Sequence, residues 1–232
     1  MLIGSGLIAQ AFAPEFLHRD DMCIYAAGVS NSGCINVREF ARERERLENA
    51  LAQAGPEVTF VYFGTCSVAD PDARNTPYVQ HKLAMEQLVA AHPHYLILRL
   101  SQVAGRTPNP HTLLNFLYAR ISRSEAFCLW RKARRNIIDI NDVASISRQL
   151  FADTSMRNYT LNIANPTNYS ITDIVHAMEN NVGKRAVYEV VDRGSEYSID
   201  IGKISPILDK GIVGFDDNYL ERVIGKYYGK IS

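Results

Sequence analysis

The sequence predicts an α/β fold with a doubly wound parallel sheet and a small C-terminal lobe, and three observations indicate it. Apolar, β-branched stretches alternate with amphipathic helical patterns along most of the 232 residues. The chain opens with a short apolar segment that runs into Gly4-x-Gly6-x-x-Ala9 and then an apolar helical stretch. Residues 58–63 are apolar throughout, as expected for a parallel strand buried on both faces.

Composition narrows the classes of protein that fit. Hydrophobic residues make up 47% of the chain, and 25 basic residues balance 25 acidic ones, which disfavours bulk binding to nucleic acid or anionic membranes. We find neither an apolar run long enough for a bilayer nor a secretion-signal pattern, and we expect a cytoplasmic protein without a membrane partner. Cys23, Cys34, Cys66 and Cys128 lack metal-ligand spacing, so we expect reduced thiols and no metal site.

The N-terminal glycine motif is typical of a dinucleotide-binding turn. Gly4 would allow the tight turn, Gly6 would let a diphosphate approach the backbone, and Ala9 would let helix and strand pack closely. The helix start would offer free N–H groups to a phosphate. The next strand ends in small residues without an acid, so NAD and NADP both stay open, and Arg38 or another basic residue could serve a 2′-phosphate. The alternative is an ordinary strand-to-helix turn.

Tyr78 and Lys82 lie four residues apart in a predicted helix that Pro77 would begin, so their side chains share a face. A nearby ammonium group lowers a phenol's pKa, which would make this pair a general acid/base. Thr65 and Ser67 follow the buried strand and could hydrogen-bond the reacting oxygen. The competing interpretations are a solvated helix face and two loop-capping hydroxyls.

The remaining segments alternate as the fold class requires. Residues 36–54 form a predicted helix with three inward apolar positions, Phe40, Leu47 and Leu51. Its charged run 42–46 is predicted to be a solvated face with internal ion pairs. Strands are predicted at 94–100, 126–130, 136–140, 159–163 and 187–191, and helices at 112–122, from 141, from 170 and at 216–228.

Two helix starts and one basic cluster complete this reading. Asn141 or Asp142 would cap the helix after residue 140, and Ser170 with Asp173 forms a predicted capping box. Arginine suits bidentate phosphate contacts, so a basic cluster near the only tryptophan could bind a diphosphate or be a charged surface. The cluster consists of Arg131, Lys132, Arg134 and Arg135.

Taken together, these motifs resemble the extended short-chain dehydrogenase/reductase superfamily of nucleotide-sugar epimerases, dehydratases and reductases. The likeness covers nearly the whole chain in order. It is carried by Gly4-x-Gly6-x-x-Ala9, Ala26-Ala27, Thr65-Cys66-Ser67-Val68, Tyr78-x-x-x-Lys82, residues 98–105 and 135–144, and Tyr159–Ile163 followed by Tyr169-Ser170-Ile171.

The resemblance implies a Rossmann-type domain over 1–165, with 105–136 contributing to a substrate lobe that 166–232 completes. It implies an NAD(P)-dependent oxidoreductase or epimerase that acts on a nucleotide-linked sugar in surface polysaccharide biosynthesis, and a possible homodimer packed through helices. A ligand-binding regulatory module of the same fold without turnover is the alternative.

The resemblance also implies roles for individual residues. In the family mechanism the tyrosine moves the hydroxyl proton, and the lysine holds the nicotinamide ribose. The implied catalytic residues are Tyr78, Lys82, Thr65 and Ser67. The implied cofactor-binding residues are Gly4, Gly6, Leu7, Ile8, Ala26, Ala27, Lys82 and Gln102. The implied substrate-binding residues are Asn115, Arg131 and Arg135.

The sequence departs from the family pattern in two places. One strand–helix unit separates the glycine turn from 58–63, where the family has three strands, and 25–28 is similar to the family's fourth strand. A shortened adenosine-binding half is therefore implied. Cys66-Ser67 stand where the 4,6-dehydratases carry Asp-Glu, so dehydration is not expected.

Overall fold

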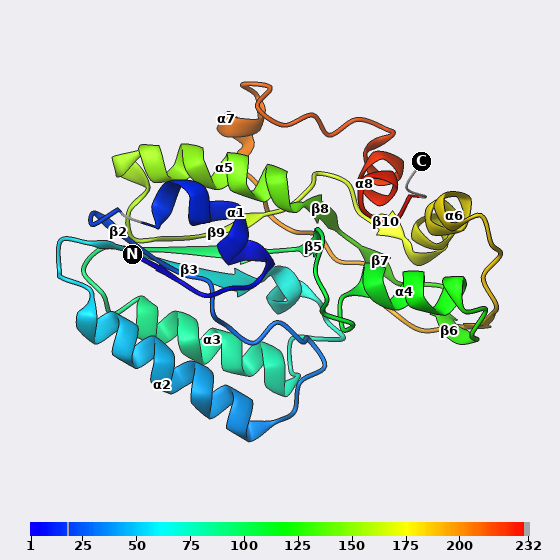
Figure 1. The fold of residues 1–232 in the computed structure, drawn as a ribbon, viewed down its shortest axis with the longest axis horizontal. Coiled ribbons are helices and arrows are strands. Elements are labelled where there is room, and N and C mark those ends of the chain that lie inside the picture. The colour runs from blue at the N-terminus through cyan, green and yellow to red at the C-terminus, as the bar shows by residue number, and fades with distance from the viewer. Residues whose placement is uncertain (18, 230–232) are drawn as a thin grey trace.

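A parallel five-stranded sheet organises the protein, for which the computed structural model describes residues 1–17 and 19–229 (Figure 1). Its strands lie in the order β1 (Leu2–Ile3), β2 (Met22–Tyr25), β3 (Thr59–Thr65), β4 (Tyr95–Leu100) and β9 (Tyr159–Ile163). Every neighbouring pair is parallel, and β3 is buried along its whole length. The predicted α/β class with a parallel sheet is confirmed.

Helices cover both faces of the sheet (Figure 1). α1 (Leu7–Phe16) and α5 (Ile140–Ala152) pack on one face, where Phe12, Phe16 and Val143 join the largest hydrophobic cluster. α2 (Val37–Gln53) and α3 (Pro77–Val89) pack on the other face through Leu47 and Met85. Each strand therefore contributes side chains to two cores, which explains the continuous apolar runs in the sequence.

Both right-handed and left-handed crossovers connect the strands of this sheet. Each of the four steps from β1 to β9 goes in the same direction along the sheet, yet α1 and α5 cover one face and α2 and α3 the other. Crossovers that step in one direction and place helices on opposite faces have opposite hands, so two of the four depart from the right-handed rule. The sheet consequently has helices on both faces without any reversal of strand order, and β1 forms its edge.

A second lobe lies beside the carboxyl ends of the strands (Figure 1). Its helices are α4 (Leu113–Ser122), α6 (Ile171–Val182) and α8 (Tyr219–Tyr228). Its strands pair as β6 (Phe127–Trp130) with β11 (Tyr188–Val191) and β7 (Arg134–Arg135) with β10 (Tyr169–Ser170), while β5 (Gln102–Ala104) pairs with β8 (Ile137–Asp139) near the sheet. Short helical segments lie at Cys66–Ala69, Thr154–Met156 and α7 (Ser205–Leu208).

A separate hydrophobic cluster holds this lobe together, with Leu117, Leu129, Met178 and Val223 among its buried members. Ile204 belongs to the predicted lobe by its place in the sequence, but its side chain packs in the hydrophobic cluster of the sheet. The domain boundary between 165 and 166 stays a prediction, and residues 230–232 of the predicted lobe lie outside the described residues.

The observed N-cap agrees with the predicted one at α6 and differs from it at α5. The capping box of α6 is confirmed, because Ser170 and Asp173 exchange side-chain-to-backbone hydrogen bonds. The predicted cap of α5 by Asn141 or Asp142 is wrong, since the helix begins at Ile140 and its N-cap Asp139 accepts from the Asn141 N–H. Asp139 also accepts from Lys226 and Tyr227, so α8 fixes this cap in place.

Helix α2 contradicts its predicted solvated face at one position. Glu43 is only 2% exposed, while Arg44 and Glu48 form the expected surface ion pair. Glu43 lies one turn before Leu47 on the face that packs against the sheet, so its carboxylate is buried with that apolar stripe. Phe40 and Leu51 are half-buried beside it.

Two further observations concern the described part of the chain. All four cysteines are free, as expected for reduced thiols. Among residues 1–17 and 19–229, the helices are too short or too polar to cross a membrane.

Candidate functional site

A cavity of about 630 Å³ opens at the carboxyl ends of β1, β2 and β3, where parallel α/β sheets bind ligands. It brings together residues that lie far apart in the sequence. All the predicted catalytic and cofactor residues line it: Gly4, Gly6, Leu7, Ile8, Ala26, Ala27, Thr65, Ser67, Tyr78, Lys82 and Gln102. The sequence therefore located the cavity correctly, and the role of each residue stays a prediction.

The glycine turn has the geometry that an approaching phosphate needs. Gly4 has φ +133°, and a Cβ there would lie 2.4 Å from the Ala26 carbonyl oxygen, so only glycine fits. A Cβ on Gly6 would meet nothing within 4 Å. Gly6 precedes α1 without a side-chain cap, which leaves N–H groups of the first turn without a side-chain acceptor. The residues present fit the diphosphate of a dinucleotide.

Tyr78 lies in the first turn of α3, whose start is fixed by Pro77 and by the Thr76 hydroxyl accepting from the Val79 N–H. Its side chain is buried against the cavity wall, and burial raises its pKa. The Glu43 carboxylate raises the pKa of Tyr78 further, while a hydrogen bond with the Thr65 side chain lowers it. The expected lowering of this pKa by Lys82 is wrong, because Lys82 is not among the groups that shift it.

Lys82 forms an ion pair with Glu43, which belongs to the charged run 42–46 that was predicted to be solvated. Its Nζ donates to Glu43 Oε1 and to the Tyr62 hydroxyl, both at 3.1 Å. Burial pushes the pKa of Glu43 upward, but a hydrogen bond from His81 and the charge of Lys82 outweigh it and lower that pKa to about 2. The Lys82 cation is therefore compensated at its own position.

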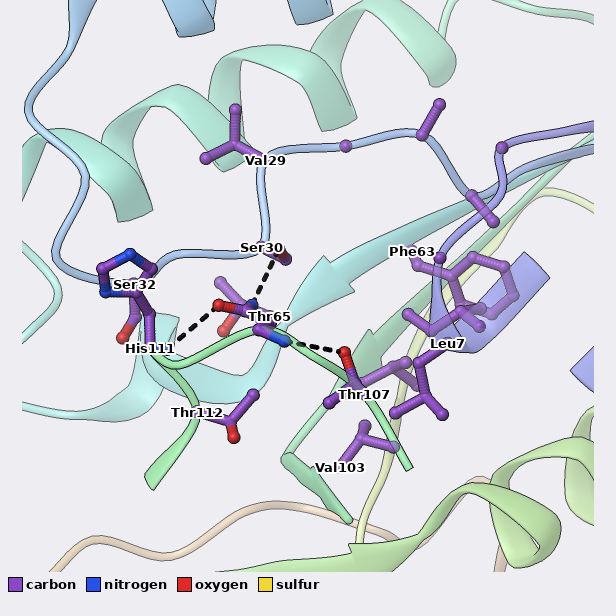
Figure 2. Close-up of a pocket in the computed structure, with 18 of the residues that line it drawn as sticks. Leu7, Val29, Ser30, Ser32, Phe63, Thr65, Val103, Thr107, His111 and Thr112 are labelled. Atoms are coloured by element: carbon purple, nitrogen blue, oxygen red, sulfur yellow. Dashed lines mark hydrogen bonds between the residues drawn. The ribbon is translucent and has the colours of Figure 1, made fainter. Parts of the chain in front are cut away.

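The loop of residues 106–112 forms another wall of the cavity, and none of its residues was predicted as a site residue. Figure 2 shows the loop that carries Thr107, His111 and Thr112 next to the loop that carries Ser30 and Ser32, and all five residues line the cavity. The Asn109 side chain donates to the Ser30 hydroxyl at 3.1 Å and joins the two walls. Arg46 and Arg106 also line the cavity. The order of the elements could have indicated these residues, because the loop follows β4 and β5 directly and so lies at the edge of the sheet where ligands bind.

The three predicted substrate-binding residues do not line the cavity. Arg131 is exposed and pairs with Asp192 at 2.8 Å. Asn115 donates to the carbonyl oxygens of Thr107 and Asn109, so it holds the cavity loop from behind.

Arg135 lies with its Nη1 3.9 Å from the buried Asp70 carboxylate. Asp70 follows the short helical turn that carries Ser67, so Arg135 is held beside the cavity rather than in it. In the described residues we find no group of three or more His, Cys, Asp or Glu side chains placed to hold a metal ion.

Comparisons with known proteins identify the fold and the family. The model of the NAD dependent epimerase/dehydratase family matches residues 26–164. UDP-glucuronic acid 4-epimerase from Bacillus cereus, solved with UDP-glucuronic acid and NAD, superposes with a TM-score of 0.70 and 19% identity, over 90% of this chain and 74% of that chain.

Two further structures share the fold. UDP-glucose 4-epimerase from Thermus thermophilus in complex with NAD gives a TM-score of 0.68 at 15% identity, over 93% of this chain and 78% of that chain. RMD from Pseudomonas aeruginosa complexed with NADPH gives 0.66 at 15% identity, over 88% and 80%. A search of curated proteins found no match to the sequence.

Proposed function

We propose that this chain, which belongs to the NAD dependent epimerase/dehydratase family, is an NAD(P)-dependent epimerase or reductase that acts on a nucleotide-linked sugar. The observation that carries this proposal is the single cavity lined by the glycine turn, Thr65, Tyr78 and Lys82. Similar folds are solved with NAD and UDP-glucuronic acid or with NADPH. A role in surface polysaccharide biosynthesis stays a prediction.

The proposed chemistry assigns one task to each group. A bound nicotinamide dinucleotide would exchange a hydride with the sugar carbon. Gly4, Gly6 and the start of α1 would hold its diphosphate. Tyr78 would give or take the proton of the sugar oxygen, and the Thr65 hydroxyl, which interacts with Tyr78, would orient that oxygen. Lys82 would hold the nicotinamide ribose after release from Glu43.

A cofactor-binding module without turnover is the second candidate, and two observations favour it. Lys82 is already paired with Glu43, and β1 forms the sheet edge beside the glycine turn. Such a module would bind the dinucleotide in the same cavity and leave every sugar unchanged.

The test is a binding and turnover experiment with NAD, NADP and a panel of UDP-, GDP- and dTDP-sugars. For the enzyme we expect dinucleotide binding and conversion of at least one sugar. Because general acid/base catalysis contributes about 10²–10⁴-fold, Tyr78→Phe should lower turnover by that factor while dinucleotide affinity changes little. Tyr118→Phe, which removes a hydroxyl outside the cavity, is the matched control. Unchanged turnover in Tyr78→Phe would refute the role of Tyr78, and binding without turnover of any sugar would favour the module.

A further inference from the structure

The loop of residues 106–112 is held from outside the cavity by a side chain of helix α4. Asn115 donates from its amide nitrogen to the carbonyl oxygens of Thr107 and Asn109, at 2.9 Å and 2.7 Å. The amide oxygen of Asn115 accepts from the Tyr228 hydroxyl at 2.6 Å, and Tyr228 is the last residue of α8. One amide group therefore connects the C-terminal helix with a loop that forms a wall of the cavity.

The Tyr228 hydroxyl determines which way the Asn115 amide faces. An amide donates only from its nitrogen and accepts only at its oxygen, so a reversed amide would place its oxygen against two carbonyl oxygens. The observed orientation is favoured because the Tyr228 hydroxyl donates to the amide oxygen and both carbonyls accept from the nitrogen. Tyr228 is 9% exposed, and its ring lies 5.3 Å from that of Tyr118 on α4, so packing between the two helices fixes the ring that carries the hydroxyl.

The two carbonyls that Asn115 holds belong to the part of the loop that joins the other wall of the cavity. The Asn109 N–H donates to the Thr107 hydroxyl at 3.3 Å, and the Asn109 side-chain oxygen accepts from the His111 N–H at 3.0 Å. These bonds leave the side-chain nitrogen of Asn109 for the Ser30 hydroxyl, to which it donates at 3.1 Å. The backbone that Asn115 fixes is therefore the backbone from which Asn109 reaches Ser30.

The two sides of the loop are held unequally. On the outer side Asn115 makes two hydrogen bonds, and both are partly buried. On the cavity side the hydrogen bond between Asn109 and Ser30 is neutral and exposed, so water competes for both partners and its net contribution is small. The contact with Ser30 therefore depends on the outer anchor, which keeps Asn109 within reach.

We propose that Tyr228 is a positioning residue that orients Asn115 and thereby holds the loop of residues 106–112 closed. In the closed loop Asn109 bonds Ser30, and a ligand is retained in the cavity. This inference rests on the proposed function, in which the ligand is a dinucleotide with its sugar substrate, and it gives α8 a role in retaining them. The proposed proton-transfer groups lie on β3 and α3, so loosening the loop should weaken binding more than it slows the chemical step.

The first test is hydrogen exchange in the ligand-free protein, which needs neither cofactor nor sugar. Tyr228→Phe removes one hydroxyl, so the amides of residues 106–112 should exchange faster by about 2- to 10-fold, the effect of one lost hydrogen bond. Asn115→Asp keeps the shape of the side chain and an acceptor for Tyr228 but loses both donors to the loop, so exchange should be faster still. Mass spectrometry of the peptide that covers the loop measures both effects.

Two variants are matched controls for this test. Tyr118→Phe removes a hydroxyl from the ring that packs against Tyr228 and leaves the contacts of the Asn115 amide in place. Asn162→Asp removes an amide nitrogen that donates to the Asp200 carbonyl oxygen at 2.8 Å, away from the loop on β9. Neither control should change exchange in the loop. Wild-type exchange in Tyr228→Phe, or an equal effect in Tyr118→Phe, would overturn the proposal. An acceleration that extends through the central sheet would also overturn it, because Tyr228 would then be a general structural contact.

Ligand binding gives the second readout. The dissociation rates of NADH and NADPH, followed by nicotinamide fluorescence, should rise by about 2- to 10-fold in Tyr228→Phe. Where a sugar is converted, its KM should rise while kcat changes less. Unchanged dissociation rates, or a fall in kcat at constant KM, would overturn the proposal. A wild-type protein that binds neither dinucleotide would instead refute the proposed function, and hydrogen exchange would still decide whether Tyr228 holds the loop.

Discussion

Two buried ion pairs flank the same part of the sheet, and they differ in what they reach. In one, Glu43 and Lys82 are both almost fully enclosed, with side chains 1% and 4% exposed. In the other, Glu86 contacts Arg99 through three hydrogen bonds, but the Arg99 side chain is 25% exposed. Only the first pair has a member among the groups that shift the Tyr78 pKa.

The difference shows why an ion pair near a titratable group of the cavity is more than a stabilising contact. A buried pair recovers its desolvation cost only when its remaining donors and acceptors are satisfied, as those of Glu43 are. Its further partners are the Val29 N–H, the Tyr62 hydroxyl and His81 Nε2. Such a pair also fixes the electric field at its neighbours. Arg99 can reach water, so the second pair can hold β4 and α3 together without setting the charge state of the cavity.

Removing the enclosed carboxylate should have the largest effect on stability. Glu43→Ala leaves a buried cation and three unpartnered donors, and we expect a loss of about 3–5 kcal/mol in the free energy of unfolding. Glu86→Ala should cost about 1–3 kcal/mol, because Arg99 can turn toward solvent. Urea denaturation measures both. A greater loss in Glu86→Ala would reverse the comparison.

A double variant sharpens this result. Glu43→Leu with Lys82→Met removes both charges together, and apolar replacement of a buried pair is often close to neutral. We expect the double variant to be more stable than either single variant by about 2 kcal/mol or more. Additive losses in the double variant would show that the two side chains do not interact.

Acid should destabilise the protein through Glu43. Its pKa is lowered from 4.5 to about 2, so its contribution to stability is complete above pH 4.5 and is lost as pH falls toward 2. The slope should reach at most about 1.4 kcal/mol per pH unit. The measurement compares urea denaturation of wild type and Glu43→Gln at several pH values between about pH 6 and pH 2, and the wild type should lose more stability. Parallel curves would exclude Glu43 as the titrating group.

The sequence predicted those features that local geometry decides. The glycine turn, the shared face of Tyr78 and Lys82, and the hydroxyls after β3 depend on backbone within a few residues, and all of them reach the cavity. The parallel sheet followed from strand composition for the same reason.

Glu43 could not be predicted in this way. Its burial depends on Tyr62 and His81, which are 19 and 38 residues away in the chain, and a helix with alternating charges is normally solvated. The positions of Arg131 and Arg135 outside the cavity have the same origin, since Asp192 and Asp70 hold them through tertiary contacts. The left-handed crossovers were also beyond the sequence, because strand order is a long-range property.

The smallest expected effect comes from substituting the glycine that packs against each ion pair, Gly28 for the first pair and Gly64 for the second. Gly28→Ala would place a methyl group against Lys82 Nζ and Glu43 Oε1, whereas Gly64→Ala would place one 2.3 Å from Glu86 Oε1. Both carboxylates must move, but a shift of Glu43 also breaks its hydrogen bonds with three further partners. We therefore expect Gly28→Ala to cost about 1–3 kcal/mol and Gly64→Ala less, as measured by urea denaturation. Because a methyl at 28 also separates Lys82 from Glu43, only Gly28→Ala should alter the titration of Tyr78, as measured by phenolate absorbance, and an effect of Gly64→Ala on Tyr78 would show that the two pairs act as one network.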